Sequence, residues 1–456
     1  MKRSRWLRVL GLAGIATLFV SGSSLETARA LDIERSPAVV LFFTGSVQGY
    51  LDLCGCPTFP LGGLDRRRGY IRSIERLWPR ASTLLLDSGN FAESPGRSGD
   101  IKTQGLVEGM NRMGYAVSGI GERELFGGVE WFESMTAEAD FPLITANIVR
   151  ASDGRPWRAR NAILETAGMS FGIVAATAFN PTARWELPDG DHLRIVEPTD
   201  PVRETVEAMQ EKVDVVVLLA SMPVEDARHL VSEVKGIDLV LGAHSALATA
   251  EPIRIDSTTV LYAGDQGRFV VQLEVYPREG MKPEFMATLV PLSEKVEVDE
   301  EMGAFAFDVL ARADQAEVEK RLALSEVRSE EVTYMGPGAC AGCHGDILKT
   351  WSKSGHARSY ELLALQQGGY KPECIRCHVT AYNEPGGFVD LDLTPHLKAV
   401  SCEACHGPAG EHVKSPEAPY GEVKVKSCTI CHTAEQDAEF DFYRDKARVS
   451  HSGAAP

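Results

Sequence analysis

Hydrophobic and polar positions follow two different patterns along the 456-residue chain. Up to about Leu292, short apolar runs alternate with stretches in which apolar residues recur every three or four positions. The runs are typical of buried strands and the stretches of amphipathic helices. The predicted strands are 38–45, 83–87, 141–146, 171–176, 214–220, 237–242 and 260–264, and the predicted helices are 63–78, 103–113, 129–136, 200–212 and 224–234. This order predicts an α/β domain in which two sheets lie between helices.

The pattern changes after residue 293. Residues 294–333 are strongly charged, with apolar Phe305, Val309 and Leu310, and we predict a helical connector there. Residues 334–456 contain too few long aliphatic runs for an ordinary core, so short helices, loops and almost no sheet are expected. The predicted organisation is therefore a removable leader (1–30), an α/β domain (31–293), a connector (294–333) and a small C-terminal domain (334–456).

The C-terminal domain repeats one cysteine pattern. Cys-x-x-Cys-His occurs four times, at Cys340, Cys343 and His344; Cys374, Cys377 and His378; Cys402, Cys405 and His406; and Cys428, Cys431 and His432. Two thiols at this spacing reach the two vinyl groups of one porphyrin, and the next imidazole can bind its iron. Isolated Cys-x-x-Cys pairs also occur in zinc sites and redox dithiols. A histidine after every pair favours four covalently bound haem c groups.

Further histidines can supply the second axial ligand of each iron. Eight of the 11 histidines follow Met335, the last methionine of the chain. The four outside the motifs are His356, His396, His412 and His451. Two imidazoles per iron and low potentials are therefore expected. His356 and His412 are the strongest candidates, followed by His451. His396 is equally compatible with a surface position, and without it one iron has an open face.

The N-terminus predicts export. Basic residues between Lys2 and Arg8 precede an apolar run from Val9 to Val20, and Ala28 and Ala30 provide small residues for cleavage after about Ala30. This pattern is typical of a secretory signal peptide, and later runs are too short to cross a bilayer. We expect a soluble periplasmic protein without a membrane span.

The charge of the chain narrows the class of partner. The formal net charge is −17, and most of the acidic excess lies before Met335. Such acidity disfavours nucleic acid as a partner, because its phosphates carry charge of the same sign. With four haem groups expected, the predicted partners are periplasmic redox proteins.

Three segments of the C-terminal domain, 340–357, 371–388 and 402–412, resemble the tetrahaem cytochrome family of ammonia-oxidising bacteria and its multihaem relatives. The resemblance implies stacked haem groups, mostly with two histidine ligands, and electron movement along the stack. In that family the haem at the second motif can lack a distal ligand. Carried over, this is the haem held by Cys374, Cys377 and His378, unless His396 ligates it.

Segments of the first domain resemble the periplasmic 5′-nucleotidase type of metallophosphatase. They are 43–50, 62–67, 84–90, 121–124, 141–147 and 240–245. The resemblance implies a four-layer α/β/β/α sandwich that holds two divalent metals. The family binds them through an Asp-x-His pair, a bridging Asp, an Asn-His pair and later histidines.

This chain departs from the family at the metal-ligand positions. They hold Ser46 and Gln48, Asn90, Glu122 and Arg123, Ser221, and His244 with Ala246. Two nearby dications need an anionic bridge and several imidazoles to offset their repulsion, whereas Asn90 is neutral and Arg123 is a cation. We therefore expect no dinuclear metal centre. A weak single-ion site formed by His244, Glu122 and Glu124 is an alternative.

Cys54 and Cys56 flank one glycine just after the first predicted strand. An ordinary disulfide is one interpretation for an exported protein. A bridge across so short a ring is strained and hence more reducible, so a redox-active or metal-binding dithiol is the other.

These features favour a periplasmic electron carrier, with the degenerate metallophosphatase-like domain used for docking or binding. One alternative is an oxidoreductase that acts at an open haem face or at Cys54 and Cys56. Another is a metal-dependent hydrolase of phosphate or sulfur esters, by likeness to the thiosulfate-pathway hydrolase of the same superfamily. Whether the protein is an enzyme at all is left open, with hydrolase activity disfavoured.

Overall fold

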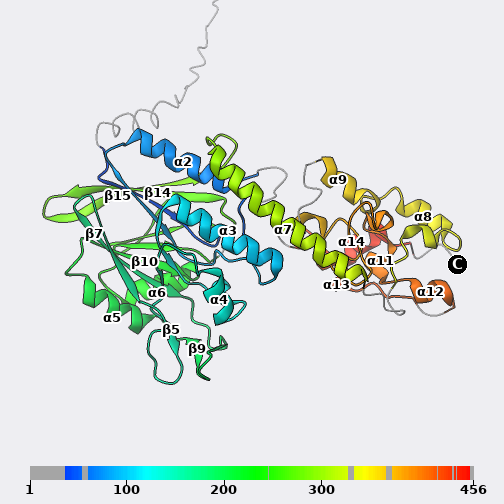
Figure 1. The fold of residues 1–456 in the computed structure, drawn as a ribbon, viewed down its shortest axis with the longest axis horizontal. Helices are drawn as coiled ribbons and strands as arrows, with labels where there is room; N and C mark the ends of the chain where they lie inside the picture. The colour runs from blue at the N-terminus through cyan, green and yellow to red at the C-terminus, as the bar shows by residue number, and fades with distance from the viewer. Residues whose placement is uncertain are drawn as a thin grey trace, which may run out of the picture.

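The protein consists of a strand-rich part and a small helical part, connected by one long helix (Figure 1). The computed structural model describes residues 36–53, 60–244, 246–326, 333–365, 372–417, 420–433, 436–437 and 439–451. The predicted signal peptide, Cys54 and Cys56 lie outside the described residues. None of the helices within the described ranges combines the length and the apolar composition needed to cross a bilayer.

The first of two large sheets has the strand order β15-β14-β1-β2-β3-β4. Its central strands run parallel, and β14 and β15 form an antiparallel hairpin beside β1. The strands are β1 (Val39–Thr44), β2 (Ser82–Asp87), β3 (Tyr115–Gly119), β4 (Leu143–Ile144), β14 (Phe269–Arg278) and β15 (Met281–Pro291).

The second large sheet has the order β12-β13-β11-β10-β7-β6, with four parallel central strands and an antiparallel strand at each edge. Its strands are β6 (Asn161–Thr166), β7 (Met169–Thr177), β10 (Val215–Ser221), β11 (Leu239–Gly242), β12 (Ile253–Ile255) and β13 (Thr258–Tyr262). A third, small sheet contains β5 (Ile148–Arg150), β8 (Trp185–Glu186) and β9 (His192–Ile195).

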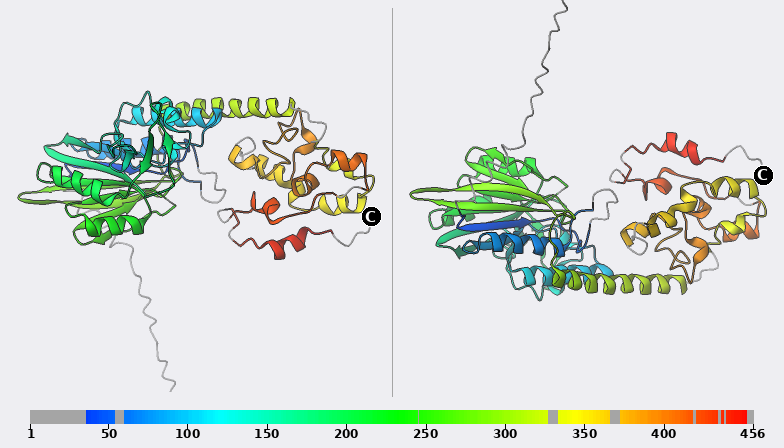
Figure 2. Two further views of the ribbon diagram at one scale, coloured as in Figure 1. Left: turned by 90° about the horizontal axis from the view of Figure 1, so that it is seen from below. Right: turned by 90° about the horizontal axis from the view of Figure 1, so that it is seen from above.

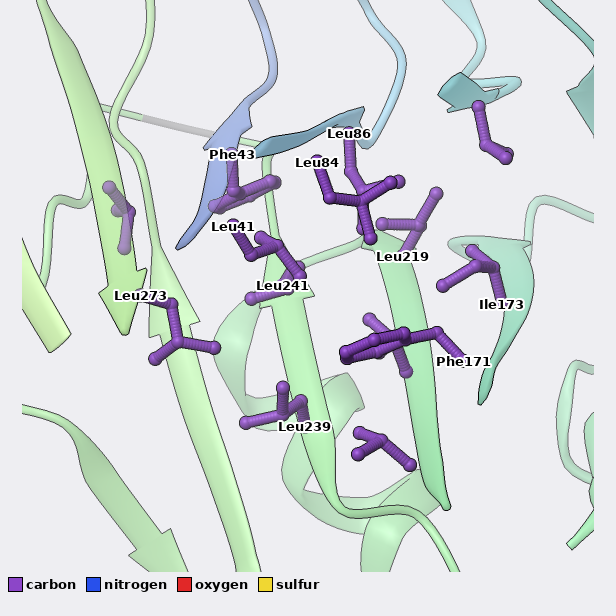
Figure 3. Packing of buried hydrophobic residues seen from close by; sticks show 14 of the residues in the cluster. Leu41, Phe43, Leu84, Leu86, Phe171, Ile173, Leu219, Leu239, Leu241 and Leu273 are labelled. Carbon is purple, nitrogen blue, oxygen red and sulfur yellow. The ribbon is translucent and has the colours of Figure 1, made fainter. Parts of the chain in front are cut away.

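The two large sheets bury one apolar layer between them. Figure 3 shows Leu41, Phe43, Leu84 and Leu86 of the first sheet pointing toward side chains such as Leu219 of the second. Alternate residues of the same strands face the opposite side, where helices cover them. Burial on both faces explains why these strands are continuous apolar runs in the sequence.

Helices form the two outer layers. The first sheet is covered by α2 (Leu64–Leu77), α3 (Arg97–Met113) and the first part of α7 (Glu300–Glu326), and the second by α5 (Thr199–Met209) and α6 (Val224–Glu233). The short helices η1 (Arg123–Leu125) and α4 (Val129–Met135) pack with the small sheet. The predicted four-layer α/β/β/α fold class is confirmed.

The predicted strands do not include β3, the edge strands β6 and β12, the β14–β15 hairpin or the small sheet. Along β15 the residues are only partly buried or exposed, so its alternation of polar and apolar residues lacks the apolar run expected of a central strand. The strand predicted over 141–146 is reduced to Leu143–Ile144, because Ala146 leaves the first sheet and donates its backbone N–H to Ala175 of the second.

The predicted connector is a 27-residue helix that contacts both parts of the protein. Near its start, Met302, Ala306 and Val309 are buried in the core over the first sheet. Near its end, Arg321 donates hydrogen bonds to the Val389 carbonyl (3.1 Å) and the Tyr382 hydroxyl (2.9 Å). Both views of Figure 2 show α7 along one side of the molecule, from the sandwich to the helical part.

From residue 333 onward, the described residues form short helices and no strand. The elements are η2 (Pro337–Cys340), α8 (Gly345–Trp351), η3 (His356–Arg358), α9 (Ser359–Leu365), α10 (Pro372–Ile375), η4 (Pro395–Leu397), α11 (Cys402–His406), α12 (Gly410–Lys414), α13 (Val425–Thr429) and α14 (Phe442–Val449). One small apolar cluster, made of Tyr360, Leu363, Ile375, Val379, Phe388 and Leu397, is buried among them.

Two glycines test how the segment before α7 packs on α2. A Cβ on Gly69 of α2 would lie 1.9 Å from the Glu297 carbonyl oxygen, whereas one on Gly303 of α7 would meet Asp65 at an ordinary 3.5 Å. Alanine stabilises an exposed helix by about 1 kcal/mol relative to glycine. We therefore expect Gly303→Ala to raise the free energy of unfolding by about 0.5–1 kcal/mol, and Gly69→Ala to lower it by about 1–3 kcal/mol. Denaturant unfolding followed by circular dichroism measures both, and equal stabilisation by the two variants would contradict this packing.

A buried polar network lies where β1 and β2 end. Asp87 accepts hydrogen bonds from the Thr44 hydroxyl and the Gly89 N–H, both at 2.7 Å. The Thr44 hydroxyl also contacts the Tyr115 hydroxyl, to which Arg67 donates. Burial raises the pKa of Asp87 to about 6, despite the hydrogen bonds that oppose the rise.

This raised pKa predicts a pH-dependent stability. Between about pH 4 and pH 6 the folded chain retains the Asp87 proton and the unfolded chain has lost it, so stability falls as the pH rises through this window. The expected loss from this group is on the order of 3 kcal/mol. The Asp87→Asn variant has no titrating carboxyl at this position and should not show this pH-dependent loss of stability. Unfolding free energies of both proteins at several pH values measure the effect, and a difference between them that is independent of pH would refute it.

Candidate functional site

The cysteine motifs lie around one large cavity. Its volume is about 2,040 Å³, compared with roughly 300–1,000 Å³ for a typical small-molecule pocket. Six motif cysteines line it, Cys374, Cys377, Cys402, Cys405, Cys428 and Cys431, together with His356, His378, His406, His432 and His451. The cavity is therefore large enough for several bulky groups and contains the donor atoms of three motifs.

Each motif coincides with a tight turn or a short helix. The His344 N–H donates to the Cys340 carbonyl and the His432 N–H to the Cys428 carbonyl, at 2.8 and 2.9 Å, as in one turn of an α-helix. Residues three positions apart in such a turn share a face. The two thiols of one motif therefore point to the same side, with the histidine directly after them.

The motifs contact one another in an order that differs from their order along the chain. The Cys340 and Cys402 thiols are close enough to shift each other's pKa, and so are the thiols of Cys377 and Cys431. Burial and the neighbouring Cys428 raise the pKa of the Cys405 thiol. The attachment points thus form a row in the order first, third, fourth and second motif.

Three motif histidines face a second histidine ring. An imidazole nitrogen binds a metal at about 2.0 Å and lies about 1.1 Å from its ring centre, so two imidazoles on one iron have centres roughly 6 Å apart. The observed distances between ring centres are 6.3 Å for His344 and His412, 6.1 Å for His432 and His356, and 5.7 Å for His406 and His451. Each distance fits one iron between the two rings.

The histidine of the second motif differs from the other three. Within the described part of the chain, His378 has no ring contact with another histidine. His396 is exposed on η4, where its main chain and Cβ pack against Gly336. The structure therefore does not bring His396 to His378.

In three motif histidines the Nδ1 atom makes a hydrogen bond, which leaves Nε2 as the nitrogen that can bind a metal. Nδ1 of His378 contacts the Ser359 carbonyl and Nδ1 of His406 the Gly421 carbonyl, each at 2.7 Å. Nδ1 of His432 contacts the Asp437 carboxylate at 2.8 Å. Such partners hold the proton on Nδ1 and leave Nε2 free to bind a metal. The residues present therefore fit haem groups.

Two aromatic residues that were not predicted from the sequence stack on these imidazoles and orient them. Tyr420 stacks on His412 and His406, with ring centres 4.8 and 5.6 Å apart, and Phe440 stacks on His432 at 4.7 Å. Both follow the third or fourth motif in the sequence, but their spacing from it has no recognisable pattern. Only the folded chain places them against the rings.

The metal-ligand positions of the first domain meet at the ends of the strands. The Asn90 amide donates to the Ser221 hydroxyl at 2.7 Å and accepts from the Arg123 backbone N–H at 3.1 Å. The buried Ser46 hydroxyl has no hydrogen-bond partner in the described structure. We call Ser46, Asn90, Arg123, Glu124 and Ser221 the strand-end cluster. The structure thus brings together side chains from separate segments, an arrangement that the sequence predicted only through the family resemblance.

The strand-end cluster is filled by its own side chains. The buried Glu124 carboxylate accepts three backbone N–H groups, from Asn90, Ala92 and Gly121, at 2.7 to 3.0 Å. A Cβ on Gly121 would lie only 2.3 Å from the Asn90 amide oxygen. This donor set does not fit two divalent metals, because the Glu124 carboxylate and the Asn90 amide oxygen already accept backbone N–H groups and the other members are neutral or cationic.

The alternative of a single-ion site is not supported. Glu124 is turned to the backbone, Glu122 accepts from the Asn180 amide, and His244 is exposed. Across the ranges that the structure describes, no group of three or more His, Cys, Asp and Glu residues could hold a metal ion. The hypothesis that His244, Glu122 and Glu124 share one ion is therefore wrong for the described structure.

The large cavity also reaches the first domain. Its lining includes residues 49–53, Glu93 and Lys102, and Leu310 and Asp314 of α7. Residues 49–53 belong to the segment after β1 that also carries Ser46 of the strand-end cluster. The end of the sandwich that carries this cluster therefore faces the cysteine motifs.

Comparison with known sequences assigns relatives to both parts. Residues 339–407 match the family described as cytochrome c554 and c-prime. Cytochrome c-554 of Nitrosomonas europaea is 30% identical over 107 residues, which cover 19% of this chain and 46% of that protein. The 5′-nucleotidase of Diplobatis ommata is 24% identical over 229 residues, 49% of this chain and 37% of that protein. The chain thus spans less than half the length of these relatives.

Solved structures share the fold of the first domain. The Thermus thermophilus sulfate thiohydrolase SoxB, solved with glycerol, superposes with a TM-score of 0.53 at 19% identity, covering 60% of each chain. A 5′-nucleotidase precursor from Thermus thermophilus gives a TM-score of 0.51 at 18% identity, covering 66% of this chain and 61% of that one. The chain therefore joins a domain with the 5′-nucleotidase-like metallophosphatase fold to a cytochrome domain similar to cytochrome c554.

Proposed function

We propose that this protein is a periplasmic electron carrier with four covalently bound haem c groups. The observation that carries the proposal is the set of three imidazole pairs with ring centres 5.7 to 6.3 Å apart, each containing one motif histidine. Haem iron supplies one-electron exchange when bound, and paired imidazoles favour low potentials.

The proposed ligands follow from the contacts described above. The eight motif cysteines form the thioether bonds, in the pairs Cys340 and Cys343, Cys374 and Cys377, Cys402 and Cys405, and Cys428 and Cys431. The axial pairs are His344 with His412, His406 with His451, and His432 with His356. His378 of the second motif is the axial ligand of an iron with an open face.

The row of motifs defines an electron route. The thiols that lie near one another support the order first, third, fourth and second, so the first and second motifs are its ends. Ile375 of the second motif lines a small pocket together with Ala311, Val318 and Arg321 of α7. Cys343 of the first motif is exposed. One end of the route therefore adjoins the helix that leads to the sandwich, and the other end faces solvent.

We propose that the sandwich domain docks or binds a redox partner and has no dinuclear metal centre. The neutral and cationic residues of the strand-end cluster and the three backbone donors on Glu124 support this proposal. The net charge of −17 favours a basic partner protein, because the opposite charge accelerates the encounter.

A second candidate function is an oxidoreductase that acts at the open iron of the second motif. It is favoured by the absence of a histidine ring beside His378 in the described structure, and by a cavity shared with Glu93 and Lys102 of the sandwich. A redox role for Cys54 and Cys56 stays a prediction, since both lie outside the described residues.

Distal-ligand variants test the axial assignment. The wild-type protein should carry four haem masses and bind carbon monoxide at one iron per chain. His412→Ala should raise the count to two, because it removes the ligand opposite His344. His396→Ala is the matched control and should leave the count at one. Intact mass and carbon monoxide difference spectra measure these numbers. A wild-type count of zero, or a rise in the His396 variant, would overturn the assignment.

The hydrolase alternative makes an opposite prediction about metals. We expect purified protein to contain haem iron but no stoichiometric manganese or zinc, and to show no phosphatase activity after either metal is added. The donor set of the strand-end cluster is the reason for this expectation. Elemental analysis and an assay with a generic phosphate ester measure both quantities. Metal-dependent turnover that Glu124→Gln abolishes would restore the hydrolase interpretation.

A further inference from the structure

His432, the histidine of the fourth motif, is held differently from its counterparts in the second and third motifs. Nδ1 of His378 and of His406 contacts a neutral backbone carbonyl, that of Ser359 or Gly421. Nδ1 of His432 instead contacts the Asp437 carboxylate at 2.8 Å. The module therefore contains one imidazole with an anionic hydrogen-bond acceptor beside two with neutral acceptors.

The local chain holds this carboxylate in place. The Asp437 N–H donates to the Thr433 carbonyl at 2.8 Å, and the Phe440 N–H donates to the Asp437 carbonyl at 3.1 Å. The Phe440 ring stacks on His432 with an interplanar angle of 17°. Asp437 thus contacts the edge of the imidazole while Phe440 covers its face, so the ring has one preferred orientation.

A carboxylate acceptor changes the ligand electronically. The Nδ1–H bond to an anion is charge-assisted, and it gives the imidazole part of the character of an imidazolate. A more basic, more negative ligand stabilises ferric over ferrous iron and lowers the reduction potential.

We infer that Asp437 is a positioning residue that lowers the reduction potential of the haem at the fourth motif through its hydrogen bond to His432. This inference rests on the proposed function, in which His432 binds iron. The fourth motif lies inside the row of attachment points, between the third and the second. Its site is therefore harder to reduce than it would be with a carbonyl acceptor, and it limits how readily electrons pass between the two ends of the row.

The test compares two isosteric variants of the holoprotein. Asp437→Asn removes the charge of the acceptor that faces His432. Asp441→Asn removes a charge four residues later, from the N-cap of α14, where the carboxylate accepts the Arg444 N–H at 2.8 Å. Arg444 also lies near Asp437, so both carboxylates share its field. The pair separates the hydrogen bond from the general effect of one lost charge.

In a spectroelectrochemical titration of all four haem groups, we expect Asp437→Asn to raise one midpoint potential. A tenfold change in the preference for ferric iron corresponds to about 59 mV for a one-electron couple. The low-spin ferric electron paramagnetic resonance signal of one haem should change as well. Asp441→Asn should leave both readouts as in the wild type, and Asp437→Glu, which keeps the carboxylate, should shift the potential less than Asp437→Asn.

Unchanged potentials in Asp437→Asn, or an equal shift of the same haem in Asp441→Asn, would overturn the inference. Should Asp437→Asn carry fewer than four haem masses, Asp437→Gln, which also replaces the carboxylate by a neutral acceptor, decides: an upward shift of a single potential supports the inference, and no shift refutes it. Failure of the proposed function is distinguishable, since the wild-type protein would then lack four haem masses or four redox steps.

Discussion

The C-terminal module depends on what fills its central cavity. Its buried apolar cluster contains only a few side chains, whereas a cavity of about 2,040 Å³ is lined mainly by its cysteines, histidines and short helices, and at one side by residues of the sandwich and of α7. A chain segment of this size cannot offset its conformational entropy with so small a core. Under the proposed function, bound macrocycles supply the missing apolar contacts, and the imidazole pairs hold separate short helices together through iron. The sandwich has no such need, because two sheets and their helices bury a continuous core.

The end of the sandwich that carries the strand-end cluster has an unusual backbone conformation. Ser46, Gln48 and Asn90 all have positive φ angles, between 49° and 58°. Non-glycine residues in this region store strain of about 1–3 kcal/mol, and such residues are concentrated at functional sites. The Asn90 and Glu124 side chains there bond to Ser221 and to the backbone, whereas the buried Ser46 hydroxyl has no hydrogen-bond partner in the described structure. This end of the sandwich thus combines strained backbone positions with amide and carboxylate groups that are already hydrogen-bonded, in agreement with the proposal that it holds no dinuclear metal centre.

The strands that are buried on both faces were predicted well from the sequence. The strands containing Leu41 and Leu219 are continuous apolar runs, and their helices show clear amphipathic spacing. The β14–β15 hairpin was missed because its outer strand is only partly buried. The four cysteine motifs were evident from spacing alone, and three of the four candidate distal histidines now lie opposite a motif histidine. Which histidine pairs with which motif could not be predicted, because the motifs contact in an order that differs from the chain order. The spacing of residues in the sequence likewise gives no signal for the contacts of Asp437 with His432 and of Tyr420 with His406.

Helix α7 has a consequence for how the chain matures. At about 1.5 Å per residue its 27 residues extend roughly 40 Å, and its two ends pack on different parts of the protein. The first half can dock as soon as the sandwich has folded. Under the proposed function, the last turns, with Arg321 on Val389 and Tyr382, need a module that is complete only after haem attachment. An immature chain therefore carries a helix end without its packing surface, and unprotected backbone of this kind is where proteases cut. Under the proposed function, the end of α7 is therefore more open to proteolysis in an incompletely loaded chain than in the mature protein.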